Sequence, residues 1–578
     1  MKVRFIKGLN IFITITVITV ASSGLWGCKK APREANKAVK DDQEEALKLD
    51  VFSMTSNYAG KQSGWFGKVV KDKFNIELNI IAPNLQDGEA KYGTRMAAGN
   101  LGDIIIFSTD DQKYTDAIKA GLLLDWNKDA LLDKYGKDIV ENYSKAIEKN
   151  KTNFGAGKSV YGLGHDISNM SANSPSEGNS MAFGPDLRWD VYEKVGAPKM
   201  KTMEDLLPVL KKMQEAEPKS DSGKPTYGFS LWGDWDTYFL TAGKQFACMY
   251  GYDELGFLLV HANQEKYQDI LDAKGYYLRT LKLYYDANKM GLIDPESISQ
   301  KYYDVNNKII DGQILFSWFP WMAEMYNTCE RVDNGKGMAF VPFSDESVYS
   351  YGATSYGGNR VIAIGAKTKD PERVMKFVNW LYTPEGIMTS NYGPKGLAWD
   401  IKDGHPFVTD FGKKALPSNK VTVPEKFGGG DFNEGGNQIN YCNVKTTSIN
   451  LEFNEPYDYN LWKSTLESQP TSLEKSWKSA MGASTSKEYL IKNNMIAISP
   501  ALSISTDTLG SSLQQKQSKI SAIIKQYSWK MIFANNDNAF TSLENEMITK
   551  AKNLGYDEVV NFYIGQAKKQ FYARKNGK

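Results

Sequence analysis

Apolar runs near the start of the chain's main body predict an α/β unit. Residues 48–54 and 75–81 alternate apolar and polar positions, as a strand with one buried face does, and residues 104–107 are continuously apolar. A continuous apolar strand suits a parallel sheet that is covered on both faces. Helical patterns at 65–73 and 89–98 separate these strands. The order strand, helix, strand, helix, strand predicts an α/β lobe.

Further strand and helix patterns follow along the chain. The expected strands are 181–184, 228–232, 314–318, 337–342 and 360–364, and the expected helices are 187–195, 203–214, 276–289, 302–311 and 370–381. Thr202 is the expected N-cap of the helix at 203–214, with Asp205 three residues later. Three long helical patterns, 512–527, 543–554 and 557–574, end the chain, whereas residues 400–436 are rich in Gly and Pro and predict mostly loop.

The first 28 residues have the layout of a secretory signal. Basic residues precede the apolar run 11–21, and the small Gly27 precedes Cys28. This end resembles the bacterial lipobox, in which the cysteine is acylated and the preceding bond is cut, although Trp26 is bulkier than the usual residue. An uncleaved anchor helix is the alternative, but the run is shorter than the ~20 residues of a membrane span. We expect a signal peptide over 1–27, lipidation at Cys28 and a flexible tether over 28–47.

Composition narrows the function classes. The formal net charge of +2 gives no basic excess that would indicate nucleic acid binding. Cys248, Cys329 and Cys442 lie far apart and form no CxxC pair, which argues against a disulfide framework or a cysteine zinc site, although one bridge is possible. Only three histidines occur, so few bases are available for nucleophilic catalysis. We therefore expect no metal and no cofactor.

Five short motifs occur in a fixed order behind the cysteine. They are Ala97–Ile104 (Ala-Ala-Gly-Asn-Leu-Gly-Asp-Ile), Leu187–Pro198 with its Arg-Trp-Asp and Gly-Ala-Pro, Asp370–Leu381 with its Asp-Pro-Glu, Tyr392–Gly396 (Tyr-Gly-Pro-Lys-Gly), and the C-terminal pair Asp537–Phe540 and Gly555–Val559. Together they resemble the bacterial extracellular solute-binding proteins of carbohydrate ABC transporters, in particular the large lipoprotein branch. Gly102 stands where that family usually has Pro.

The resemblance implies a two-lobed, type II periplasmic-binding-protein fold of α/β class, in which hinge-linked lobes close on a ligand. We expect the first lobe to comprise 48–165 and 360–500, with a loop-rich insertion at 400–440. The second lobe would comprise 166–355 and 505–578, including the extra C-terminal helices. The implied function is to capture a carbohydrate, an oligosaccharide by the size of the chain, and to deliver it to a membrane permease. The implied protein is a monomer that performs no catalysis.

Sugar recognition needs flat aromatic faces for the ring and planar polar groups for the hydroxyls. Loops expected at the carboxyl ends of strands, where ligands bind in open α/β sheets, supply both types. The candidate contacts are Asn57, Tyr58, Asp110, Asp111, Trp232, Asp234, Trp235, Asp236, Trp321, Tyr356 and Asn359. Several have a structural alternative: a polar turn for Asn57 and Tyr58, a helix cap for Asp110 or Asp111, and a buried tryptophan pair for Trp232 and Trp235.

Two other functions fit some of these residues. Asp234 and Asp236 could serve a secreted glycoside hydrolase if they stood ~5–10 Å apart across the scissile bond. A peptide-binding lipoprotein is the other alternative, although it would need fewer aromatic surfaces. Many relatives have an acidic loop that looks able to take calcium. Here the matching loop, 217–228, offers only Glu217, Ser220, Asp221 and Ser222 before Thr226, so we expect calcium binding there to be weak or absent.

Overall fold

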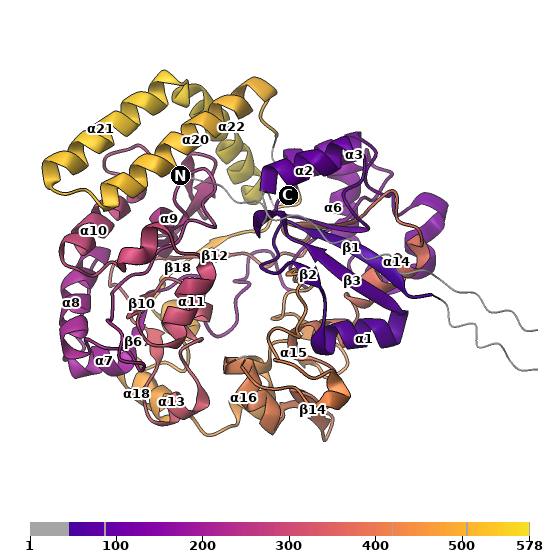
Figure 1. The fold of residues 1–578 in the computed structure, drawn as a ribbon, viewed down its shortest axis with the longest axis horizontal. Coiled ribbons are helices and arrows are strands. Elements are labelled where there is room, and N and C mark those ends of the chain that lie inside the picture. The colour runs from indigo at the N-terminus through magenta and orange to yellow at the C-terminus, as the bar shows by residue number, and fades with distance from the viewer. Residues whose placement is uncertain (1–44, 86–87, 419, 505–506, 577–578) are drawn as a thin grey trace, which may run out of the picture. The chain divides into compact units, whose positions relative to one another are not determined.

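The computed structural model describes residues 45–85, 88–418, 420–504 and 507–576. Cys28 and the predicted signal peptide lie outside the described residues, as does the predicted tether up to residue 44. Residues from Ala46 onward form one compact unit, whose elements are labelled in Figure 1. Two large apolar clusters divide this unit into two α/β lobes, as the resemblance implied.

A six-stranded sheet forms the centre of the first lobe, in the order β2-β3-β1-β4-β13-β5. The strands are β1 (Leu47–Ser53), β2 (Gly60–Lys61), β3 (Ile76–Ile81), β4 (Ile104–Phe107), β5 (Leu163–Gly164) and β13 (Val361–Ile364). β1 runs parallel to β3 and to β4, whereas β13, which returns after the second lobe, is antiparallel to β4. The carboxyl ends of β1 and β4 therefore lie at the same edge of the sheet, where ligands bind in open α/β folds.

Helices cover both faces of this sheet. Ile104 and Ile106 of β4 join one apolar cluster, while Ile105 and Phe107 join another on the opposite face. Successive residues of a strand point to opposite faces, so a continuous apolar strand is buried on both, as predicted. The helices of this lobe are α1 (Gly64–Phe74), α2 (Gly88–Ala97), α3 (Gln112–Lys119), α4 (Leu131–Tyr135), α5 (Lys137–Asn142), α6 (Ser144–Phe154), α14 (Pro371–Trp380), α15 (Pro384–Tyr392) and α16 (Asp410–Ser418).

The second lobe is built around small sheets and long helices. Its strands are β6 (Asp186–Arg188), β10 (Phe316–Ser317) and β11 (Met338–Phe340) in one sheet, β7 (Tyr252–Leu255), β8 (Leu258–His261) and β9 (Tyr267–Asp269) in another, and the parallel pair β12 (Val348–Tyr351) and β18 (Ile496–Ser499). Its helices are α7 (Trp189–Lys194), α8 (Leu206–Ala216), α9 (Thr241–Met249), α10 (Tyr276–Lys289), α11 (Tyr302–Ile310), α12 (Pro320–Ala323), α13 (Cys329–Asp333), α18 (Ser472–Met481) and α19 (Ser486–Lys492).

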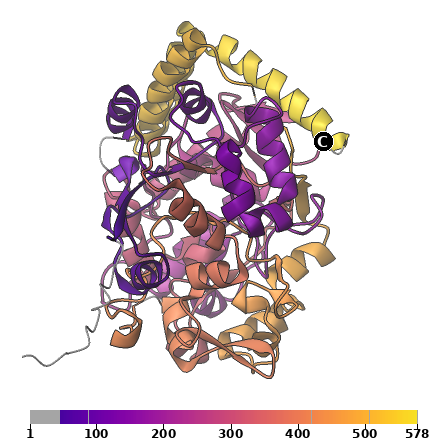
Figure 2. The same ribbon diagram turned by 90° about the vertical axis from the view of Figure 1, so that its right-hand side faces the viewer.

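Three C-terminal helices complete the second lobe. They are α20 (Ser511–Ile532), α21 (Asp537–Asn553) and α22 (Tyr556–Lys575), and apolar side chains of all three join its core. Figures 1 and 2 show these helices at the end opposite the segment that carries α16 and the hairpin of β14 (Trp399–Lys402) and β15 (His405–Val408). Among the described residues, no helix is both long and apolar enough to cross a membrane.

One segment belongs to a different lobe from the one that the sequence predicted. Residues 473–497 were expected in the first lobe, but Leu473, Trp477 and Leu490 pack in the second-lobe core. The pairing of β18 with β12 explains this, because it fixes the end of the segment to a second-lobe strand. Between the cores, the chain passes from lobe to lobe at 168–180, 352–360 and 463–472.

Two of the expected strands do not form. Residues 181–184 form no strand, and the strand at this point is β6, which starts two residues later and pairs with β10 and β11. Residues 228–232 form no strand either, and Phe229 makes a single isolated bridge to Ile293. Residues 400–436, expected to be mostly loop, contain the end of β14, all of β15 and α16, while most of the described residues after α16 form turns and irregular structure. Met181 and Phe183 are nonetheless buried in the second-lobe core, so their apolar character reflects packing without strand pairing.

Candidate functional site

A cavity of about 940 Å³ lies between the two lobes. The first lobe contributes the loop 108–112 after β4, together with Lys149, His165 and Lys445. The second lobe contributes Trp321, Tyr351 and residues of α22 such as Phe562, Gln566 and Arg574, while the segment 357–360 crosses between the lobes. Its volume falls in the range of ~300–1,000 Å³ that small-molecule sites occupy.

Four of the eleven candidate residues line this cavity: Asp110, Asp111, Trp321 and Asn359. The other seven, Asn57, Tyr58, Trp232, Asp234, Trp235, Asp236 and Tyr356, lie outside its lining. Both lobes and a crossing segment thus supply polar or aromatic groups to one space. The carboxylates come from the carboxyl end of β4, as the sequence predicted for a cleft-facing loop.

Asp110 faces a buried lysine inside the cavity. Its Oδ2 lies 3.9 Å from Nζ of Lys149, and both side chains are almost fully enclosed by protein. Burial raises the pKa of Asp110 and lowers the pKa of Lys149, because each charge loses contact with water, and their mutual attraction offsets part of this effect. Lys149 also donates to the carbonyl of Gly357, which ties the first lobe to the crossing segment. Asp111 caps α3 by accepting from the N–H of Lys113.

Trp321 presents an aromatic face to the cavity. It is 42% exposed, which is unusual for a tryptophan, and it stands at the start of the short helix α12. Its ring packs against Phe319 at 5.6 Å and against Trp235 at 6.2 Å between centroids, with planes about 30° apart in both pairs. Trp235 in turn packs on Tyr302 at 4.6 Å. Trp235 therefore contacts both the exposed ring of Trp321 and the ring of Tyr302.

Trp232 and Asp234 have structural roles. Trp232 is 5% exposed and packs edge-on against Trp235 inside the second-lobe core, which is the structural alternative named for this pair. Asp234 accepts from the backbone N–H of Tyr302 at the start of α11 and pairs with Nζ of Lys301 at 2.8 Å. These contacts use the carboxylate to fix the helix start.

Asp236 is partly buried beside the start of α9. Its Oδ1 accepts from the backbone N–H of Thr241 at 2.9 Å. Burial raises the pKa of Asp236 to about 7, and the Thr241 N–H offsets part of that rise. Asp234 and Asp236 thus bond to two different helices of the same lobe, and neither lines the cavity.

Asn57 and Tyr58 form the turn after β1. The carbonyl of Asn57 accepts from the hydroxyl of Tyr303 at 2.9 Å, which is a direct contact between the two lobes. Tyr58 packs on the first-lobe core and donates to the carbonyl of Lys61. Tyr356 lies on the crossing segment under Nζ of Lys145, which is 5.9 Å from the ring centroid.

A charged network forms the second-lobe wall of the cavity. Lys244 lies 2.7 Å from Asp253 and 3.3 Å from Glu254, and Tyr351 donates its hydroxyl to Asp253 at 2.6 Å. Burial alone would raise the pKa of Asp253, but Lys244 and Tyr351 hold it below its ordinary value. Tyr351 ends β12 where the chain leaves the lobe, so this network joins the end of β12 to α9 and β7.

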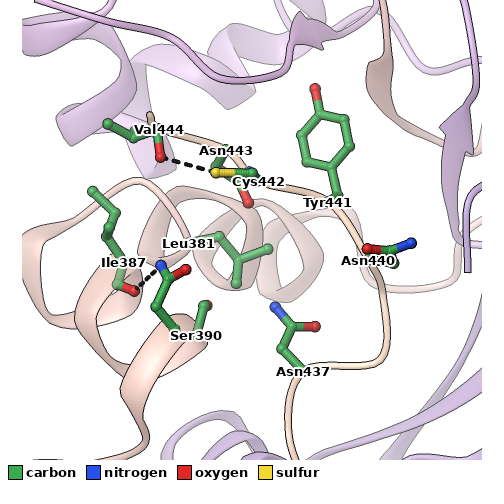
Figure 3. Close-up of a pocket in the computed structure, with 10 residues that line it drawn as sticks. Leu381, Ile387, Ser390, Asn437, Asn440, Tyr441, Cys442, Asn443 and Val444 are labelled. Carbon is green, nitrogen blue, oxygen red and sulfur yellow. Dashed lines mark hydrogen bonds between the residues drawn. The ribbon is translucent and has the colours of Figure 1, made fainter. Parts of the chain in front are cut away.

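Neutral polar groups gather in a second cavity of about 170 Å³ in the first lobe, which Figure 3 shows. It lies between α15 and the segment 437–444, and four asparagines and a serine line it: Ser390, Asn391, Asn437, Asn440 and Asn443. The sequence patterns did not predict them. The repeated asparagines of Asn437-Gln-Ile-Asn-Tyr-Cys-Asn443 were the available signal, but they adjoin a stretch that predicted only loop.

Both carboxylates of the loop at 217–228 are in ion pairs. Glu217 lies 3.1 Å from Nζ of Lys194. Asp221 lies 2.7 Å from the guanidinium of Arg331, and the hydroxyls of Ser220 and Ser222 both donate to Asp311. In the part of the chain that the structure describes, no cluster of three or more His, Cys, Asp or Glu side chains could hold a metal ion. Cys248, Cys329 and Cys442 are free thiols.

The fold has well-matched relatives among solved structures. The alginate-binding protein AlgQ2, solved without calcium ion, is 16% identical with a TM-score of 0.59, over 91% of this chain and 98% of that one. The ABC-transporter substrate-binding protein FusA of S. pneumoniae, in complex with kestose, is 14% identical with a TM-score of 0.58, over 92% of this chain and all of that one. These similarities confirm the predicted two-lobed fold.

Sequence comparison identifies the family. Lipoprotein LipO of Bacillus subtilis (strain 168) is 24% identical over 330 residues, which span 54% of this chain and 60% of that protein. The chain thus matches less than two thirds of the length of this relative. The family model of the bacterial extracellular solute-binding proteins matches residues 59–388, more than half of the chain. The chain therefore belongs to the bacterial extracellular solute-binding protein family.

Proposed function

We propose that this protein is the sugar-binding component of an ABC importer, which captures an oligosaccharide between its lobes and delivers it to a permease without chemical change. The exposed face of Trp321 carries the proposal, because it fronts the same cavity as Asp110, Asp111 and Asn359. An aromatic face opposite carboxylate and amide groups suits a ring with apolar C–H faces and hydroxyl edges. The carbohydrate ligands in the names of AlgQ2 and FusA support the same class.

The alternative functions receive less support. Asp234 and Asp236, the carboxylate pair proposed for a hydrolase, each bond to a helix start and lie outside the cavity. One common mode of peptide binding is backbone pairing at a strand edge, whereas this cavity is lined by charged, amide and aromatic residues from both lobes.

A binding screen tests the proposal. Thermal shift against maltotetraose, xylotetraose, mannotetraose, kestose and a tetrapeptide should identify a sugar that raises the melting temperature, since a ligand selective for the folded state stabilises it. Trp321→Ala should weaken binding of that sugar about tenfold, because stacking and the buried ring face together contribute ~1.4 kcal/mol or more. Tyr572→Ala is the matched control, since Tyr572 is 48% exposed and outside the cavity lining.

The same screen separates a binder from an enzyme. The bound sugar should be recovered intact by mass analysis after prolonged incubation. Stabilisation by the peptide alone, or turnover of the sugar, would contradict the proposal.

We further propose that the mature chain is anchored by a lipid on Cys28 at the outer face of the cytoplasmic membrane. The signal layout supports this, as does the word lipoprotein in the name of LipO. Cys28→Ala should release the protein from the membrane fraction and abolish incorporation of labelled palmitate. Unchanged membrane retention would favour an uncleaved anchor helix.

A further inference from the structure

The small first-lobe cavity, which we call the amide pocket, has no charged side chain in its lining. Its ten lining residues are Leu381, Ile387, Ser390, Asn391, Asn437, Asn440, Tyr441, Cys442, Asn443 and Val444. Aliphatic groups and polar amides share this lining, as they do in sites that bind hydroxylated rings. The volume of about 170 Å³ has room for roughly five waters at ~30 Å³ each, or for one hydroxylated ring of that size.

One buried polar atom of the lining has no partner in the described part of the chain. The Oγ of Ser390 is buried and makes no hydrogen bond with any described residue. Asn443 is 6% exposed, and its side chain lies close enough to the buried hydroxyl of Tyr382 to offset part of the rise that burial causes in the pKa of that phenol. Since a buried donor without an acceptor costs ~1–3 kcal/mol, the Ser390 hydroxyl indicates that something polar fills the space. The thiol of Cys442 is satisfied instead, because it donates to the carbonyl of Val444 (Figure 3).

The amide pocket adjoins the interlobe cleft. The carbonyls of Ile439 and Asn440 accept from Ser53 and Thr55 at the carboxyl end of β1, next to the turn that Tyr303 of the second lobe contacts. Further along, the carbonyl of Cys442 accepts from the N–H of Asp166, a residue that lines the 940 Å³ cavity. The segment 437–444 therefore follows the cleft edge of the first lobe.

We propose that the amide pocket is a subsite for one uncharged, hydroxylated ring of the captured oligosaccharide. This inference rests on the proposed function and makes it specific. The amides and Ser390 donate to and accept from ring hydroxyls, while Leu381 and Val444 pack against C–H groups. A ring bearing a carboxylate would be excluded, because its charge would lose water without meeting a cation in the lining.

Two variants test the subsite with the tightest-binding sugar of the panel above. Asn391→Ala removes a rim amide, and its matched control is Asn493→Ala, since both amides donate to the carbonyl four residues earlier at 2.8 Å. Ser390→Leu fills the pocket. We expect Asn391→Ala to weaken binding about threefold or more and Asn493→Ala to leave it unchanged. Ser390→Leu should weaken binding more strongly. If Ser390→Leu does not fold, Asn391→Ala alone decides the test.

A charge test uses the same sugar oxidised to a uronate at its terminal primary alcohol. The neutral form should bind the unchanged protein at least about tenfold more tightly than the uronate form, and Ser390→Leu should reduce this difference. If Trp321→Ala weakens sugar binding while both pocket variants bind normally, the subsite is disproved and the proposed function stands. Ordered water alone in the pocket of a sugar complex would also disprove it. If no sugar binds at all, the proposed function itself fails, and the subsite fails with it.

Discussion

The carboxyl of Asp236 releases its proton at a higher pH in the folded protein than in the unfolded chain, where it does so near pH 4. Because burial raises its pKa to about 7, folding is favoured at low pH, and this contribution is lost as the pH rises from about 4 to about 7. We expect Asp236→Asn to remove that loss while keeping the oxygen that accepts from Thr241. From pH 5 to pH 8, the free energy of unfolding of the variant should rise by roughly 2 kcal/mol relative to that of the unchanged protein. Urea unfolding at the two pH values measures it.

Other buried carboxyls also titrate. The test is therefore the difference between variants in how the free energy of unfolding changes with pH, and not that change in one protein alone. Asp72→Asn is the control, since this exposed carboxylate pairs with Lys68 at the surface. If Asp236→Asn and Asp72→Asn change the pH dependence equally, the raised pKa of Asp236 is refuted.

The loop at 217–228 offers a prediction about metal. The guanidinium of Arg331 already takes Asp221, and Asp311 is satisfied by two serine hydroxyls. A hard cation would have to displace a charge-assisted pair and would still find few oxygens. We expect millimolar calcium to leave the melting temperature unchanged. Tight calcium binding by calorimetry that Asp221→Ala abolishes would contradict this.

Side-chain chemistry was predictable from the sequence at this scale, but side-chain exposure was not. Trp232 and Trp321 both sit in short aromatic motifs, yet one is in the core and the other is 42% exposed. The difference depends on which neighbours cover each ring, and those neighbours come from distant parts of the chain. Asn443 was missed for the same reason, because its pocket forms only when the segment 437–444 meets α15.

Among the elements, α22 combines a structural and a site-forming face. Phe562 and Gln566 line the interlobe cavity, whereas Gly565 between them is exposed, and a Cβ added there would meet no atom within 4 Å. Glycine inside a helix costs ~0.5–1 kcal/mol relative to alanine. We expect Gly565→Ala to raise the free energy of unfolding by about that amount without changing sugar affinity. Chemical denaturation and calorimetry measure the two effects.

Gly352 is the opposite case and serves as the comparison. It begins a crossing segment, and a Cβ there would lie 2.2 Å from the carbonyl oxygen of Ala172 and 2.7 Å from that of Ser499. Gly352→Ala should therefore destabilise the protein by pushing the backbone away from the crossing segment at Ala172 and from the end of β18. Equal effects of the two substitutions would show that backbone crowding at the hinge does not matter.

Long periodic elements were predictable from sequence, and short pairings were not. The helix 276–289 matches α10 at both ends, because its apolar positions repeat with helical spacing. Residues 181–184 have an equally apolar pattern but pair with no strand. A run of four residues cannot distinguish a strand from a buried loop, since both bury the same side chains. The hairpin β14–β15 was missed because each of its strands has only four residues and lies in a stretch rich in Gly and Pro.

For the whole molecule, contacts between the lobes indicate how a ligand would favour one arrangement. The hydroxyl of Tyr303 donates to the carbonyl of Asn57, and the thiol of Cys329 donates to the carbonyl of Lys413 on α16. A ligand shifts the balance between open and closed lobes only by binding the closed state more tightly. Bonds that exist only when the lobes meet therefore contribute to apparent sugar affinity, although they never touch the sugar.

Tyr303→Phe isolates this effect, because it removes a single oxygen and keeps the ring. We expect about two- to tenfold weaker sugar binding, the equivalent of one hydrogen bond of ~0.5–1.5 kcal/mol. The sugar should also reduce the radius of gyration in X-ray scattering, and the variant should need more sugar to reach the same compaction. Tyr572→Phe is the control, since its hydroxyl bonds to Glu265 within the second lobe. Unaltered affinity in Tyr303→Phe, or a radius that sugar leaves constant, would mean that the lobes do not close on their ligand.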